Sequence, residues 1–85
     1  MFIYLMEADH IQNSKEKTLS QKVADRIIKY ILEENLQPGD KLPNETIMCQ
    51  RLNVGRSSLR EAMRALTSRN VITIRQGSGS YVSAT

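Results

Sequence analysis

The sequence predicts a mainly α domain of three helices followed by a small β-hairpin. Three stretches repeat apolar residues at a spacing of three to four, as amphipathic helices do. Two short stretches rich in β-branched and aromatic residues then flank a glycine-rich turn. The chain has 85 residues, 40% of them hydrophobic and 25% charged, which is enough for one small domain and too little for a large substrate cavity.

The first helix is expected over residues 20–35. Thr18 or Ser20 can supply the side-chain oxygen that caps its start. Pro38 cannot continue a helix, and Gly39 supplies turn geometry, so the chain must leave the helix before this point. The apolar stripe of this helix consists of Val23, Ile27 and Ile31, with Ile28 and Tyr30 beside it.

The second and third helices are expected over residues 45–52 and 56–69. Asn44 is a typical N-cap, and the charge of Glu45 suits the positive end of the second helix. The three residues at 53–55 include a glycine, so the two helices form a helix-turn-helix unit. The side chains expected to be buried are Ile47, Met48, Cys49 and Leu52 in the second helix, and Leu59, Ala62, Met63 and Leu66 in the third.

The remaining segments are shorter. Residues 41–43 are expected to be extended because a residue before proline avoids helical geometry. After Asn70, which marks the end of the third helix, strands are expected at 71–75 and 81–83, joined by a turn over 76–80.

Residues 1–18 begin with an apolar run at 1–6, turn polar and show no sustained period. We expect them to form an extension outside the core, whose order the sequence leaves open, and residues 19–85 to form the domain.

Positive charge gathers in the last part of the chain. The chain as a whole has 12 Lys and Arg, 9 Asp and Glu and a net charge of +3. From residue 51 onward, however, all the cations are arginines and Glu61 is the sole acid. Along the third helix Arg56, Arg60 and Arg64 recur every four residues and drift only about 40° per step, so they form one stripe.

This stripe predicts a helix that reads DNA in the major groove. Recognition helices read bases with their N-terminal residues, and arginine can contact O6 and N7 of guanine. A serine hydroxyl is short enough to bond a base edge or a phosphate. The alternative is an ordinary solvated face, which normally mixes charge signs at this spacing. The predicted contacts on the helix are Arg56, Ser57, Ser58, Arg60 and Arg64.

The hairpin alone could merely close the sheet. Placed directly after an arginine-bearing helix, it is predicted to be a wing that reaches the minor groove or phosphates, because glycine permits close approach of the backbone. The predicted wing contacts are Arg75, Gln76 and Gly77. The expected fold class is therefore a three-helix winged helix-turn-helix.

Three motifs, in residues 36–45, 52–62 and 71–82, resemble the GntR family of bacterial transcription regulators and its FadR-like branch. The resemblance covers about residues 19–82. It implies a winged helix-turn-helix that binds a palindromic operator as a dimer, with Arg56 and Arg60 on bases, Ser57 and Ser58 on phosphate or bases, and Gln76 and Gly77 at the wing tip.

The sequence also departs from this family. Thr46 stands where members usually have an arginine, which puts one DNA contact in doubt. Gly55 stands where Ser or Thr usually caps the recognition helix, and Ile47 replaces an acid that often completes a capping box. Members also carry a C-terminal effector domain that supplies most of the dimer contact, so the resemblance implies that a small-molecule effector acts only through a domain absent from this chain.

Other functions fit less well. No catalytic set of side chains is visible, one cysteine and one histidine cannot make a zinc site, and no cofactor is expected. No stretch is long enough to span a bilayer, and a lone cysteine suits a reduced compartment, so the expected location is the cytoplasm. The expected function is that of a metabolite-responsive repressor. The alternative is a protein-interaction module, which predicts an apolar or mixed-charge third helix.

Overall fold

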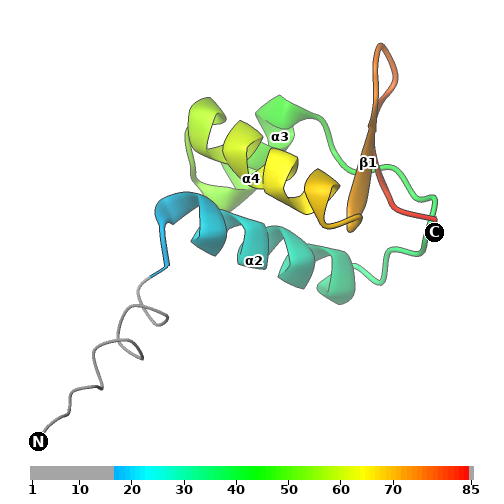
Figure 1. Cartoon of the computed structure of the whole chain (residues 1–85), viewed down its shortest axis with the longest axis horizontal. Helices are drawn as coiled ribbons and strands as arrows, with labels where there is room; N and C mark the ends of the chain where they lie inside the picture. Colours follow the sequence, from blue (N-terminus) through cyan, green and yellow to red (C-terminus); the bar gives the residue numbers. More distant parts are fainter. Residues whose placement is uncertain (1–16, 85) are drawn as a thin grey trace, which may run out of the picture.

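Three helices and an antiparallel hairpin follow one another in the computed structural model, which describes residues 17–84. Helix α2 packs against α4, α3 packs beside α4, and the hairpin projects beyond the helices on one side (Figure 1). The predicted fold class is confirmed. Most of the predicted extension, with its apolar run at 1–6, lies outside the described residues. The elements are α2 (Leu19–Glu33), α3 (Glu45–Leu52), α4 (Arg56–Ser68), β1 (Ile72–Arg75) and β2 (Gly79–Val82).

Helix α2 starts with a complete capping box. The Thr18 hydroxyl accepts a hydrogen bond from the Gln21 backbone N–H at 3.2 Å, and the Thr18 N–H donates to Gln21 Oε1 at 2.9 Å. Two N–H groups at the helix start are thereby satisfied within the motif. Of the two expected caps, Thr18 is the one used, and the helix begins one residue earlier than predicted.

An asparagine in the left-handed conformation follows each of the three helices within two residues. Asn35, Asn53 and Asn70 have φ values of 55°, 56° and 63°. In each case the next residue is apolar, packs on the core and donates its N–H to a carbonyl five residues earlier, as in the Schellman motif. These bonds run from Leu36 to Ile31, from Val54 to Cys49 and from Val71 to Leu66. They explain why α2 and α4 end at Glu33 and Ser68, shortly before the predicted residues 35 and 69.

The apolar faces of the helices meet in one core, which the hairpin closes through Ile72. Helix α3 has the predicted bounds, but the prediction that Ile47 is buried was wrong, because its exposed fraction is 38%. Ile47 follows Asn44 by three residues, and its N–H is bound by the Asn44 side chain, so this position faces outward at the helix start. The buried residues are Val23, Ala24, Ile27, Ile31, Leu42, Met48, Leu52, Leu59, Ala62, Leu66 and Ile72.

The hairpin pairs β1 with β2 in antiparallel register, with Ile72 opposite Val82 and Arg75 opposite Gly79. Its second strand starts two residues earlier than the predicted 81–83, because the turn is shorter than expected. The segment before α3 pairs with β2 through two backbone hydrogen bonds. The Leu42 N–H donates to the Ser80 carbonyl, and the Val82 N–H donates to the Asp40 carbonyl, each at 2.8 Å. The hairpin is thus anchored along β2 to the chain that leads into α3.

Candidate nucleic-acid interface

The first two arginines of the predicted stripe share one carboxylate from the neighbouring helix. Arg60 donates from Nε to Glu45 Oε2 at 2.7 Å and from Nη2 to Glu45 Oε1 at 3.0 Å. Arg56 donates from Nη1 to the same Oε1 at 2.6 Å and from Nη2 to the Thr46 hydroxyl at 3.0 Å. One turn of α4 thus presents two guanidinium groups fixed by the first turn of α3.

Both arginines favour the charged form of the shared carboxylate. The hydrogen bond from Arg60 is the largest effect that holds the pKa of Glu45 below its ordinary value, and Arg56 acts in the same direction. The same bond raises the pKa of Arg60. Both arginine side chains stay more than half exposed, at 55% for Arg56 and 59% for Arg60, so they remain open to a ligand.

The rest of the predicted helix contacts lie around this pair. Arg64 is exposed and has no ion partner among residues 17–84. Ser57 is exposed and Ser58 half-buried, both in the first turn of α4. Gly55 caps that turn without a side-chain hydrogen bond, so no side chain of the described residues competes there for the backbone N–H groups.

The three predicted wing residues lie at the end of the hairpin. The Ser78 N–H donates to the Arg75 carbonyl at 3.0 Å, which places Gln76 and Gly77 at the tip of the turn. Gly77 has a φ of +76°, and a Cβ built there meets no atom within 4 Å. The Arg75 guanidinium lies over the Tyr81 ring, 5.0 Å from its centre, and the Tyr81 hydroxyl bonds to Ser78. These contacts stiffen the hairpin below its tip.

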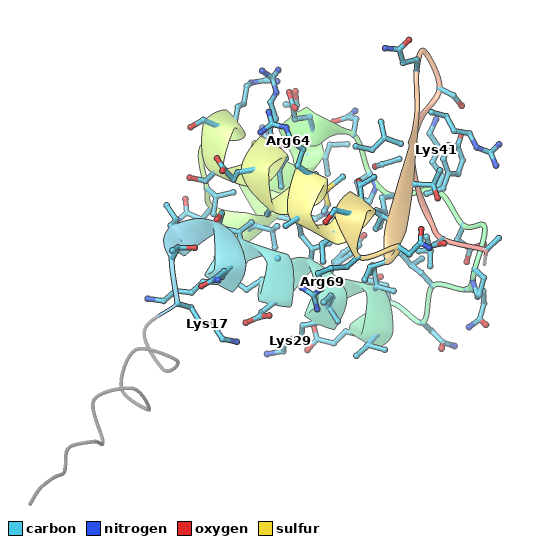
Figure 2. All side chains as sticks on the ribbon, viewed as in Figure 1. Lys17, Lys29, Lys41, Arg64 and Arg69 are labelled. Atoms are coloured by element: carbon cyan, nitrogen blue, oxygen red, sulfur yellow. The ribbon has the colours of Figure 1, made fainter. Side chains whose placement is uncertain are left out.

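The helix stripe and the hairpin lie on the same side of the domain. Figure 2 shows Arg64 on the side of α4 toward which the hairpin projects, with Lys41 beside the hairpin. Lys17 and Lys29 lie on the opposite side, along α2 (Figure 2). The structure therefore brings the residues predicted from α4 and from the wing to one face.

Sequence reasoning missed three members of this face. The charge of Glu45 was expected only to stabilise the N-terminal end of α3. Thr46 was noted only as the residue that stands where relatives usually have an arginine. Lys41 was not singled out at all, although its side chain lies against Gly79 in the hairpin. None of these contacts is local in sequence, since each joins residues ten or more positions apart.

Neither a metal centre nor a membrane span is found in the described part of the chain. Among residues 17–84, no three His, Cys, Asp or Glu side chains are grouped so that they could hold a metal ion. None of the described helices is long and apolar enough to cross a membrane.

A family model settles what kind of domain this is. The model for bacterial regulatory proteins of the gntR family matches residues 19–82, which is most of the chain. The chain belongs to the GntR family of bacterial regulatory proteins. The match includes every element from α2 to β2 and therefore both parts of the candidate interface.

Two GntR relatives illustrate the similarity. The mannosyl-D-glycerate transport/metabolism system repressor MngR of Escherichia coli K12 is 39% identical over 66 residues, covering 78% of this chain and 28% of MngR. A solved GntR structure from Streptococcus agalactiae is 48% identical with a TM-score of 0.74, covering 76% of this chain and 32% of that one. The chain thus spans about a quarter to a third of the length of these relatives.

A second similar structure was solved with DNA. The DNA-binding domain of AraR, solved in complex with operator ORX1, has a TM-score of 0.72 and 26% identity, covering 82% of this chain and 84% of that one. Together with the family match, this similarity identifies residues 19–82 as the DNA-binding domain of a GntR-family transcription regulator.

Proposed function

We propose that this domain binds its operator by laying α4 in the major groove, with Arg56 and Arg60 reading guanines. The observation that carries this proposal is the arginine stripe, fixed in position and exposed at the N-terminal half of α4. A guanidinium has five N–H donors. Arg60 turns its Nε and Nη2 toward Glu45, while its Nη1 donates to no described residue. One edge of Arg60 thus remains available for O6 and N7 of a guanine.

In this proposal Glu45 positions the arginines. A flexible arginine loses side-chain entropy when it docks, and a side chain already held in place loses less. The carboxylate also limits unselective attraction to phosphates, because it offsets part of the positive charge at the start of α4. Thr46 adds a neutral acceptor for Arg56, where an arginine would have added a further cation.

The remaining contacts follow from the same placement. Ser57 and Ser58, with the uncapped N–H groups of the first turn, suit a phosphate at the positive end of α4. Arg64, one turn further along, is assigned to a phosphate. The hairpin tip, with Gln76 and Gly77, is assigned to the adjacent minor groove, and Arg75 to its edge or to a phosphate.

At the level of the whole regulator, we propose a cytoplasmic homodimer that binds a palindromic operator and represses transcription in response to a small metabolite. MngR supports repression and the link to metabolism, since its name describes a repressor of a transport and metabolism system. AraR supports operator binding, since its DNA-binding domain was solved on one.

Selection from a pool of random duplexes tests the proposal. The 85-residue chain is expected to enrich one half-site with guanines at fixed positions, because a monomeric or weakly dimeric chain reads each half of an operator separately. An inverted repeat of that half-site among the selected sequences would support two-fold operator symmetry. Recovery of sequences no different from the starting pool would contradict operator reading and would favour a protein-interaction role.

A further inference from the structure

An open groove separates the recognition helix from the hairpin. Its volume is about 400 Å³. Its floor is apolar and includes the side chains of Met48, Met63 and Ile74, from three different elements. The exposed fraction of Ile74 is 50%, although Ile72, two residues earlier in the same strand, is fully buried. The fold thus leaves apolar surface uncovered between the two parts of the interface.

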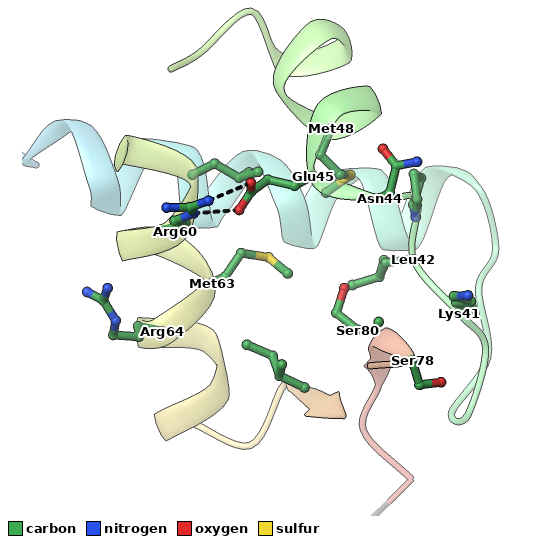
Figure 3. A pocket seen from close by; sticks show the side chains of 14 residues that line it. Lys41, Leu42, Asn44, Glu45, Met48, Arg60, Met63, Arg64, Ser78 and Ser80 are labelled. Carbon is green, nitrogen blue, oxygen red and sulfur yellow. Dashed lines mark hydrogen bonds and ion pairs between the residues drawn. The ribbon is translucent and has the colours of Figure 1, made fainter. Parts of the chain in front are cut away.

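Free positive charges stand on the two sides of this groove. Figure 3 shows Arg64 on the α4 side and Lys41 on the hairpin side, across the apolar floor. Neither side chain has an ion partner among residues 17–84, whereas Arg60, also in the wall, is bound by Glu45. The end of the Lys41 side chain lies over Gly79, since its Cε is 2.9 Å from where a Cβ on Gly79 would sit. Glycine at position 79 therefore leaves the room that Lys41 occupies.

The geometry of double-stranded DNA indicates which part of the operator would lie in this groove. A major groove and the adjacent minor groove are separated by one sugar–phosphate strand. If α4 occupies the major groove and the hairpin tip the minor groove, that strand has to cross the gap between them. Its deoxyribose rings present C–H groups, which suit an apolar floor, and its phosphates present charges at the edges, which suit Lys41 and Arg64.

We propose that this groove seats one sugar–phosphate strand of the operator, that Lys41 is a phosphate contact opposite Arg64, and that Ile74 packs against a deoxyribose. The proposal rests on the proposed placement of α4 and the hairpin. It assigns a DNA contact to Lys41 and gives the exposure of Ile74 a reason.

Lys41→Met tests the charge, because methionine retains an unbranched stem beside Gly79 while losing the ammonium group. Lys29→Met is the matched control, since Lys29 is an exposed lysine on the opposite side of the domain (Figure 2). The dissociation constants of the full 85-residue chain are measured on the selected operator and on a random duplex, from 50 to 200 mM salt.

Lys41→Met is expected to weaken binding to both duplexes by the same factor, about tenfold at low salt, as for one lost charge-assisted hydrogen bond. The slope of log affinity against log salt should become shallower by about 0.9, the amount for one phosphate. Lys29→Met should bind as the wild type does. Equal behaviour of the two variants, or a loss confined to the selected operator, would overturn the phosphate assignment.

Ile74→Thr tests the apolar contact between Ile74 and a deoxyribose, because threonine retains the β-branched shape that the strand favours. With an unchanged melting temperature, it is expected to bind both duplexes several-fold more weakly while the salt slope stays that of the wild type. Wild-type affinity in this variant would overturn the sugar contact. If the wild-type chain bound neither duplex, the proposed function would fail as well. If the wild type bound DNA and the Lys41→Met and Ile74→Thr variants bound it equally tightly, only the groove proposal would fail.

Discussion

At the scale of single residues, the interface depends on one acidic side chain as much as on the arginines. Glu45 accepts three hydrogen bonds from Arg56 and Arg60, and its carboxylate is the point where α3 and α4 are tied together on the exposed side. The two arginines therefore adopt this arrangement in the free domain, before any DNA binds.

Glu45→Gln should lower the melting temperature at pH 7 by no more than a few degrees, because exposed ion pairs contribute little. The arginines hold the pKa of Glu45 below its ordinary value of 4.5, so the folded state binds fewer protons than the unfolded state near that pH. The stabilisation is therefore present above about pH 4.5 and is lost as the pH falls through the lowered pKa.

Melting curves of the wild type and of Glu45→Gln between pH 7 and pH 3 check this expectation. The gap between their melting temperatures should close toward the acidic end. Glu61→Gln is the control, since Glu61 is exposed on α4 and has no ion partner among the described residues. A gap that stays constant over the whole range would show that the ion pairs do not stabilise the domain.

The arginine stripe could be predicted from the sequence, but its counter-ion could not. Arg56, Arg60 and Arg64 follow helical spacing, which is a local property of the chain. Glu45 lies eleven residues before Arg56, and its approach depends on the angle between two helices. That angle is set by the turn at Asn53 and by core packing, neither of which is visible in the spacing of charges.

At the scale of elements, the helices were easier to predict than the sheet. Helices α2 and α4 carry strong apolar periods, α3 is bounded by Asn44 and Asn53, and a left-handed asparagine follows each helix within two residues, so the helix bounds were predicted to within two residues. The hairpin contains only eight strand residues, and its second strand is also bonded to residues 39–42, which lie far away in sequence. Such pairing depends on tertiary contacts and has no local period.

The hairpin tip provides a prediction at this scale. Gly77→Val should destabilise the fold by about 1 to 2 kcal/mol, because Gly77 is left-handed and β-branched side chains are strained there. Gly77→Asn is the more informative variant, since asparagine tolerates this conformation. It should cost little stability and should change operator affinity, because its side chain would stand where the tip meets the minor groove.

Gly39→Asn is the matched control for this variant. Gly39 also has a positive φ, of +93°, and a Cβ there also meets no atom within 4 Å, but it lies in the turn after α2. Both variants should show similar melting temperatures, and only Gly77→Asn should alter binding in a gel-shift titration. Unchanged affinity in both would make the hairpin a structural element only.

At the scale of the whole molecule, the described residues leave little surface for self-association. The exposed large apolar side chains are Leu19, Leu32, Ile47 and Ile74, which are spread over α2, α3 and β1. A stable protein interface needs a contiguous buried patch of about 1,000 Å² or more. We therefore expect the 85-residue chain to be monomeric or weakly dimeric in dilute solution.

Sedimentation velocity at micromolar concentration checks this expectation, with a chain lacking residues 1–6 measured beside the full one. Both should sediment as monomers or as weak dimers. A tight dimer that disappears on deletion would identify the apolar run as a dimer contact and would contradict the prediction.

The central claim is that Arg56 and Arg60 read bases, and the most direct test is to compare alanine variants on the selected operator and on a random duplex. Each substitution is expected to cost about 1 to 3 kcal/mol of binding free energy on the operator and to relax selectivity at one base pair per half-site, with much less loss on random DNA. Arg69→Ala, at the far end of α4, is the control and should change neither. Equal losses on both duplexes for Arg56 and Arg60 would contradict the claim and would make them phosphate contacts.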